Sequence, residues 1–211
     1  MMGRPYRLGE SMERWENLEI GRVKAYSDGI FAIAATLLAF NVKLTVQAEL
    51  PFGALLGELA PQITAFLISF SVAGIYWRNH NRMFNLLDRV DGRLNQLNMA
   101  LLATVCLMPF ATGLIGGGFH PGTGAFTLYA ATIALIGALS AAQWAYVARH
   151  PTLLNSHATS KEAWRWFIVA CVAPAVFLAS IAAAHFSVPW ALRSWVLLLV
   201  FLPLARRITR R

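Results

Sequence analysis

Six long apolar stretches follow one another along the chain, and short polar connections separate them. They cover residues of about 25–46, 56–77, 95–115, 124–148, 165–185 and 188–205. An α-helix of roughly 20 apolar residues crosses a bilayer core about 30 Å thick. The pattern therefore predicts an all-α membrane protein, with six transmembrane helices in a single domain over residues 25–205.

A transmembrane barrel is the other fold that spans a membrane, and its strands alternate polar and apolar residues over segments of about 10 residues. The stretches LLATVCLMPFATGLI and FTLYAATIALIGALSAA are instead apolar on every side. The composition also favours helices in lipid. Of the 211 residues, 57% are hydrophobic and only 13% are charged, against about 25% charged residues in soluble domains.

The net charge of +8 raises the question of nucleic-acid binding, which the positions of the cations answer. Almost all of them fall in residues 1–24, in alternate connections between the helices, or in the basic tail 206–211. Membrane proteins keep such basic segments in the cytoplasm. The asymmetry predicts a protein of the cell membrane, embedded in the lipid bilayer, with both termini cytoplasmic and no nucleic-acid partner. The cations on that side are Arg4, Arg7, Arg14, Arg22, Lys24, Arg78, Arg82, Arg89, Arg93, Arg149, Lys161, Arg165, Arg206, Arg207, Arg210 and Arg211, and only Lys43 and Arg193 lie opposite.

Two other classes of membrane protein find little support in the sequence. No motif of residues 25–115 returns in residues 124–205, so the internal repeat of many secondary transporters is missing. The sequence has no H-E-x-x-H or G-x-S-x-G motif, and no cluster of residues at metal-ligand spacing. We therefore expect no enzyme, no catalytic residue, no cofactor, no metal site and no small-molecule substrate.

The first apolar stretch combines a helical stripe with polar residues near its start. Ile33, Leu37 and Phe40 have the spacing i, i+4, i+7, which places them on one face of a helix, and Thr36 lies among them. Helix packing alone would account for such a stripe. Asp28 lies nearer the start, where a carboxylate in a membrane helix needs a partner or water, and Lys24 at i−4 is one candidate partner.

Three segments together resemble the signature of a known family. They are RVKAYSD (22–28) followed by GIFAIAATLL, then WRNHNRMF (77–84), and then LNQLNMALL (94–102) with PFAT (109–112). They are similar to the R-x-x-x-F-S-D, W-x-N-H-H-x-x-F and L-x-x-L-N-x-x-L-L…P-F-x-T motifs of the transmembrane protein 175 family, the endolysosomal potassium channels and their prokaryotic single-repeat relatives. Tyr26 replaces the usual Phe of the first motif, and Asn81 replaces the second His of the second motif.

The resemblance implies a potassium-permeable, modestly selective cation channel with K⁺ as the permeant ion. In this family the first helix lines a central pore, and single-repeat members assemble as homotetramers. The family's hydrophobic constriction falls at Ile33, with Leu37 and Phe40 as the next layers of the gate. The hydroxyl associated with potassium preference falls at Thr36. The sequence contains no TVGYG filter motif.

The resemblance also implies a cytoplasmic network that ties the first three helices together. Its members are Arg22, Tyr26, Ser27, Asp28, Trp77, His80 and Asn98. Interfacial anchoring by Trp and Arg is an equal interpretation of these residues. His80 could also sense pH, because imidazole titrates near neutrality.

Three alternatives to a potassium channel stay open. A proton channel or leak pathway could use a water wire past Asp28 and His80. A secondary transporter and a non-conducting membrane protein are the others. Potassium-dependent flux at a clamped pH would separate a cation pore from proton conduction.

Overall fold

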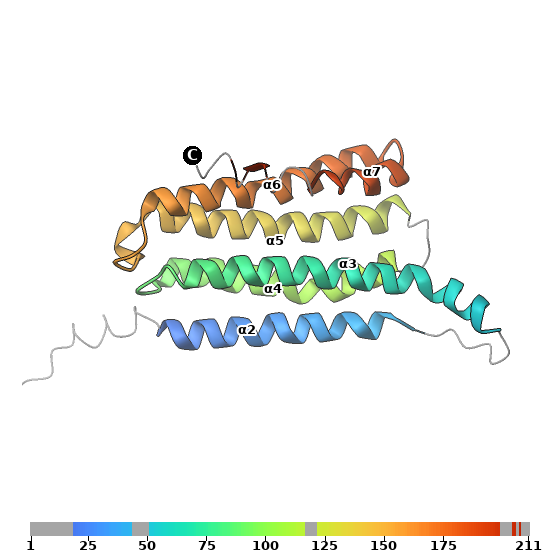
Figure 1. The fold of residues 1–211 in the computed structure, drawn as a ribbon, viewed down its shortest axis with the longest axis horizontal. Coiled ribbons are helices and arrows are strands. Elements are labelled where there is room, and N and C mark those ends of the chain that lie inside the picture. The colour runs from blue at the N-terminus through green and yellow to red at the C-terminus, as the bar shows by residue number, and fades with distance from the viewer. Residues whose placement is uncertain (1–18, 44–50, 117–121, 199–203, 206, 208–211) are drawn as a thin grey trace, which may run out of the picture.

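The computed structural model describes residues 19–43, 51–116, 122–198, 204–205 and 207. These residues form an elongated helical bundle (Figure 1). The chain order is α2 (Ile20–Leu37), the 3₁₀ turn η1 (Leu38–Asn41), α3 (Phe52–Phe84), α4 (Gly92–Ile115), α5 (Thr123–Arg149), the 3₁₀ turn η2 (Pro151–Leu153), α6 (Ser160–Ala184) and α7 (Val188–Ser194). The described part of the chain has no strand longer than the single bridge between Leu87 and Leu154.

Five of these helical segments are long and apolar enough to cross a membrane: Ile20–Asn41, Phe52–Phe84, Gly92–Ile115, Thr123–Arg149 and Ser160–Ala184. The sixth span was expected at residues 188–205. Its first part forms α7, which is seven residues long, and residues 199–203 lie outside the described part of the chain. The expected segments 1–24 and 206–211 are also largely outside it.

The helices extend beyond the apolar stretches at the end of the bundle where α2, α4 and α6 begin and α3 and α5 end. The helix α2 begins at Ile20, so Arg22 and Lys24 belong to it. The helix α3 continues past Trp77 to Phe84, because its last residues are polar but include no helix breaker. We call this the basic end of the bundle, since the cations of α2, of the end of α3 and of the α3–α4 connection gather there.

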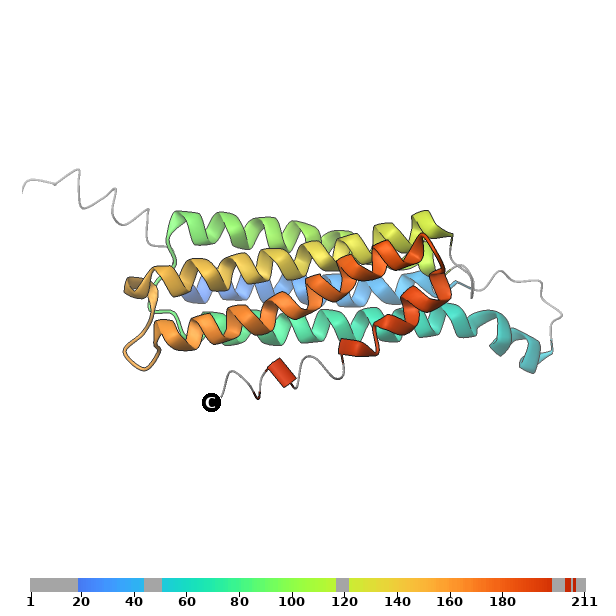
Figure 2. The same cartoon turned by 90° about the horizontal axis from the view of Figure 1, so that it is seen from above.

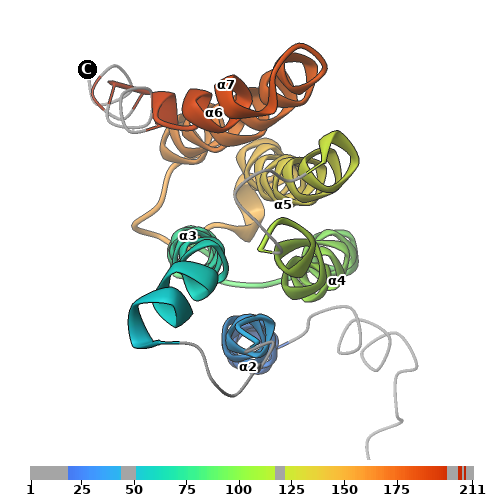
Figure 3. The same cartoon turned by 90° about the vertical axis from the view of Figure 1, so that its right-hand side faces the viewer.

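Helices that follow one another in the chain pack together, and α2 and α3 each also contact the second helix onward. The helix α2 contacts α3 and α4, α5 contacts α4 and α6, and α7 contacts α6. Figure 2 shows α7 turning back along α6. Viewed along the bundle, α2 lies at one side and α6 and α7 at the other (Figure 3). A large part of the circumference of α2 is therefore turned away from the rest of its own chain.

The core is apolar and is closed by one unusually close helix approach. Large aromatic side chains such as Phe126, Tyr129 and Trp144 are fully buried on α5. At Gly137, a Cβ atom would lie 2.7 Å from Tyr76 Oη on α3 and 2.8 Å from Pro174 Cδ on α6. Small residues let membrane helices approach in this way, so Gly137 allows three helices to meet at one level.

Candidate functional site

One face of α2 is exposed along the whole length of the helix. The side chain of Ile33 is 59% exposed and that of Phe40 is 74% exposed, and Thr36 and Leu37 are exposed on the same face. The opposite face is buried against α3 and α4, and its buried residues are Val23, Ser27, Phe31, Ala34 and Leu38. The stripe that the periodicity predicts is thus not used for packing within the chain.

Thr36 is the polar member of this exposed face. Its Oγ1 donates a hydrogen bond to the carbonyl oxygen of Ile33, with 2.8 Å between the two oxygens. A threonine hydroxyl has one proton to donate and two lone pairs that accept. Because the proton is directed to the backbone, the lone pairs of Oγ1 remain available to another group, such as a cation or a water molecule.

Asp28 is held by α3 and not by a cation of its own helix. Its Oδ1 accepts hydrogen bonds from Trp77 Nε1 at 2.8 Å and from Asn81 Nδ2 at 3.2 Å. The Nζ atom of Lys24 donates instead to Asn85 Oδ1 at 2.8 Å. The suggested pairing of Lys24 with Asp28 is therefore not what the structure contains, because neighbouring helices supply partners to both side chains.

A second set of hydrogen bonds joins the same three helices inside the bundle. His80 Nε2 on α3 lies 2.8 Å from Asn98 Oδ1 on α4, and Asn98 Nδ2 donates to Ser27 Oγ on α2 at 3.1 Å. Ser27 Oγ donates in turn to the carbonyl of Val23 at 2.8 Å. The His80 ring stacks on Phe84 with 4.3 Å between ring centroids, and His80 Nδ1 is buried without a partner among the described residues.

Asn79 has a structural role that the sequence reasoning did not assign. Its Nδ2 donates to Ser140 Oγ at 2.8 Å, and its Oδ1 accepts from Trp144 Nε1 at 3.3 Å. Both partners lie on α5. Successive side chains on a helix point about 100° apart, so the W-x-N-H motif reaches α2 through Trp77, α5 through Asn79 and α4 through His80. The position of Asn79 within the W-x-N-H motif was the signal that could have indicated this role.

The structure brings together Ser27, Asp28, Trp77, His80 and Asn98, and it places the other two motif residues elsewhere. Arg22 and Tyr26 lie on the exposed face of α2. Within the described residues no hydrogen bond joins either side chain to this network. The first turns of the exposed face therefore carry a guanidinium group and a phenol, while the network lies on the opposite side of the helix.

The far end of α2 is also anchored to α4. Asn41 Nδ2 donates to the carbonyl of Pro109 at 2.7 Å. A Cβ atom on Gly113 would lie 2.8 Å from Asn41 Oδ1, so a larger residue there would force this side chain to move. With Asp28 and Ser27 bound near the basic end and Asn41 bound at the other, α2 is fixed at both ends. Its exposed middle is held by apolar packing on one side only.

The described ranges 19–43, 51–116, 122–198, 204–205 and 207 contain no group of three or more His, Cys, Asp or Glu residues that could hold a metal ion. The chemistry that the exposed face of α2 presents is therefore simple. It offers apolar side chains, the hydroxyl of Thr36, and polar groups near the start of the helix.

Comparison with known proteins connects this geometry to a family. The family model described as the endosomal/lysosomal potassium channel TMEM175 matches residues 22–109. A potassium channel of Streptomyces collinus is 42% identical over 99 residues, which cover 46% of this chain and 48% of the relative. A potassium channel of Chamaesiphon minutus is 34% identical over 156 residues, which cover 72% of this chain and 77% of the relative.

A solved structure agrees over most of the chain. The crystal structure of a lysosomal potassium-selective channel TMEM175 homolog from Chamaesiphon minutus matches with a TM-score of 0.74 at 28% identity. The match covers 89% of this chain and 97% of that one. These relatives and this structural neighbour are ion channels, so the chain is not an enzyme. On its motifs, its fold and its similarity to the Chamaesiphon channel, the chain belongs to the TMEM175 family.

Proposed function

We propose that the chain is one subunit of a homotetrameric, potassium-permeable channel in the cell membrane. Four copies of α2 surround the central pore, each turning its exposed face toward the axis. The observation that carries the proposal is the continuous exposed face of α2, 59% exposed at Ile33, on a helix that is fixed at both ends. A single helix encloses no pore, so a ring of several copies is needed to cover this face.

The constriction we propose is a ring of four Ile33 side chains, followed by Leu37 and Phe40. A cation that passes such a ring loses hydration water and finds no oxygen ligand to replace it, so a narrow apolar ring closes by drying. The barrier falls as the ring widens, because water then enters. Small changes in the distance between the four helices would therefore control conduction without any charged plug.

Thr36 would supply the potassium preference. Its hydroxyl lies on the exposed face, one residue from Leu37, and its proton is directed to the Ile33 carbonyl at 2.8 Å. Four hydroxyl oxygens could then face a cation with their lone pairs. One ring of hydroxyls replaces fewer water molecules than stacked carbonyl rings do. Because K⁺ is easier to dehydrate than Na⁺, a modest preference for K⁺ follows, with no cofactor required.

Proton conduction past Asp28 and His80 is the competing function. The His80 side chain is only 3% exposed and lies on the buried side of the network. Its Nε2 faces Asn98, and the Asp28 carboxylate already accepts bonds from Trp77 and Asn81. These groups serve helix contacts and do not line the exposed face of α2, which favours the cation pore over a proton wire.

The orientation we propose puts the basic end in the cytoplasm. Among the described residues, Arg22, Lys24, Arg78, Arg82 and further cations lie there, whereas Lys43 and Arg193 lie at the opposite end. This distribution follows the positive-inside rule. Both termini are then cytoplasmic, and the polar start of α2 opens toward the cytoplasm.

The experiment is potassium flux from proteoliposomes at a clamped pH, with the purified protein. Replacing Ile33 by asparagine should wet the constriction and raise the flux. The matched control is Ile168→Asn, because Ile168 is 51% exposed but lies on α6, on the side of the bundle opposite α2 in Figure 3. Equal flux in wild type and Ile33→Asn would contradict the proposal, as would an equal rise in both variants.

A further inference from the structure

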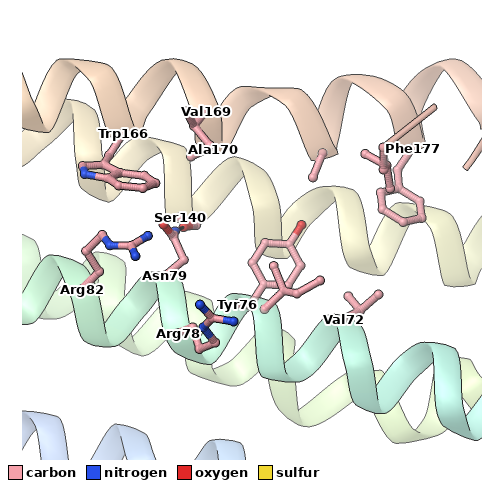
Figure 4. Close-up of a pocket in the computed structure, with 13 residues that line it drawn as sticks. Val72, Tyr76, Arg78, Asn79, Arg82, Ser140, Trp166, Val169, Ala170 and Phe177 are labelled. Atoms are coloured by element: carbon pink, nitrogen blue, oxygen red, sulfur yellow. Dashed lines mark hydrogen bonds between the residues drawn. The ribbon is translucent and has the colours of Figure 1, made fainter. Parts of the chain in front are cut away.

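A cleft of about 110 Å³ lies between α3 and α6, with α5 as its floor (Figure 4). It is far from the exposed face of α2 and belongs to no part of the proposed pore. Three of its lining residues are Arg78 and Arg82 on α3 and Trp166 on α6. As far as the structure describes it, the cleft has no carboxylate in its lining.

The lining changes in character along the cleft. Arg82 and Trp166 lie toward the basic end, where the guanidinium of Arg82 is 4.0 Å from the Trp166 ring centroid. Val72 and Phe177 lie toward the other end, with apolar residues between them (Figure 4). Ten helical residues separate Arg82 from Val72, which corresponds to about 15 Å along α3. The cleft therefore has a cationic head and an apolar body.

The polar groups between these ends are already used within the protein. Asn79 donates to Ser140 and accepts from Trp144. Tyr76 Oη donates to the carbonyl of Ile133 at 3.2 Å. Arg78 is exposed, and its positive charge adds to that of Arg82, whose guanidinium has contacts of its own, the one with Trp166 among them.

We propose that this cleft binds one anionic phospholipid of the membrane leaflet at the basic end. The headgroup phosphate lies against Arg78 and Arg82, and one acyl chain follows the apolar body toward Phe177. Guanidinium groups bind phosphate oxygens through paired N–H donors, and basic pockets between membrane helices select anionic headgroups. Tryptophan is enriched at the headgroup level of membranes, and Trp166 lies near the start of α6, at the basic end.

A phospholipid suits this cleft better than a soluble anion does. The cleft lies between two membrane-spanning helices, and most of its lining is apolar. A free phosphate ion would bind the arginines but would make no contact with the apolar part of the cleft. An acyl chain fills that body and is already present at high concentration beside it, so the two parts of the cleft are explained by one amphiphile.

The test is native mass spectrometry of the purified protein with phosphatidylglycerol or phosphatidylcholine of the same acyl chains. The wild type should retain phosphatidylglycerol in preference. Each Arg→Gln change should lower the preference about fivefold, and the pair Arg78→Gln/Arg82→Gln about 25-fold. The matched control is Arg89→Gln/Arg93→Gln, which removes the same charge at the same end outside the cleft and should leave the preference unchanged.

Two further variants distinguish the contribution of the lipid headgroup from that of the acyl chain, and both from an effect on folding. Because Arg82 also stacks on Trp166, Arg78→Gln alone should lower the preference in a chain that keeps this stacking. Ala170→Phe fills the body of the cleft and should displace the lipid although both arginines are present. The proposal fails if the double arginine variant keeps the wild-type preference. It also fails if Ala170→Phe retains phosphatidylglycerol as well as the wild type does, whether or not its oligomeric state changes.

Discussion

Replacing Asn98 by alanine removes the only polar link that joins α2, α3 and α4 in the described interior at the level of Ser27. Asn98 is fully buried; its Oδ1 accepts from His80 Nε2 at 2.8 Å, and its Nδ2 donates to Ser27 Oγ at 3.1 Å. The variant leaves Ser27 with its bond to the Val23 carbonyl. His80 would lose its hydrogen bond to Asn98, and its Nδ1 already has no partner among the described residues.

The expected loss in the free energy of unfolding follows from the two hydrogen bonds of Asn98, to His80 and to Ser27. Measured hydrogen bonds between membrane helices average about 0.6 kcal/mol and reach about 1.7 kcal/mol. Two of them give about 1.2 to 3.4 kcal/mol. We use these values because the unfolded chain in a micelle also finds polar partners. The Asn98→Ala variant should therefore lose about 1 to 3.5 kcal/mol in the free energy of unfolding.

The assay is unfolding of the purified protein in mixed micelles by sodium dodecyl sulfate, followed by far-ultraviolet circular dichroism. Gln96→Ala is the control, because Gln96 is exposed two residues earlier on α4 and should change the free energy by less than about 0.5 kcal/mol. Replacing both partners by apolar groups, in His80→Phe/Asn98→Leu, should cost less than Asn98→Leu alone. Equal stability of Asn98→Ala and Gln96→Ala would refute the reasoning.

Three further variants test other contacts. Gly137→Ala places a Cβ atom 2.7 and 2.8 Å from atoms of α3 and α6, so unfolding should become easier by about 1 to 3 kcal/mol; Gly74→Ala, with open space at its Cβ, is the control in the same micelle assay. Asp91→Ala removes the bond that caps the Leu94 amide at 2.8 Å and the bond from Tyr146 Oη at 2.7 Å. Loss of the cap by itself costs about 1 kcal/mol, so the variant should lose at least about that much, which a normal unfolding midpoint would contradict. Thr36→Val should bring the K⁺ and Na⁺ reversal potentials closer together. Thr64→Val should not, although Thr64 is also exposed and bonded to its own helix backbone. Identical reversal potentials in Thr36→Val and wild type would exclude a role of the Thr36 hydroxyl in potassium preference.

Five of the six apolar stretches coincide with long helices in the described residues, and several of these helices extend beyond the apolar stretch. The apolar run of the second span stops at Trp77, whereas α3 continues to Phe84. The length of an apolar stretch predicts only the part of a helix that lies in lipid. A helix continues beyond the lipid with its backbone hydrogen bonds intact until a helix-breaking residue such as proline follows. The same reasoning explains why α2 begins at Ile20 and not at residue 25.

The motifs indicated which helices meet, but not which atoms do. The resemblance placed seven residues in one network. Hydrogen bonds join Asp28 to Trp77 and, in a separate set, His80 to Asn98 and Ser27, whereas Arg22 and Tyr26 lie on the exposed face of α2. Sequence proximity offers only partners three or four residues away, so it suggested Lys24 for Asp28. The true partners depend on how α3 is rotated against α2, which no local pattern contains.

Periodicity predicted a stripe on α2 without telling which side of the helix is exposed. The buried Phe31 and the exposed Ile33 are both apolar, because in a membrane the outside of a subunit is as apolar as its inside. The direction of the stripe depends on the packing of α3 and α4, which cover the Ser27 side of α2.

The central claim, that the exposed face of α2 lines the conduction path, is tested most directly by a cysteine at Ile33. In a background without Cys106 and Cys171, a charged, membrane-impermeant thiol reagent is applied to Ile33→Cys and to the control Ile168→Cys, and mass spectrometry records the labelled fraction. We predict that labelling at residue 33 changes the potassium current and that potassium slows the reaction, while a labelled Ile168→Cys conducts as before. A fully labelled Ile33→Cys channel with unchanged current would contradict the account.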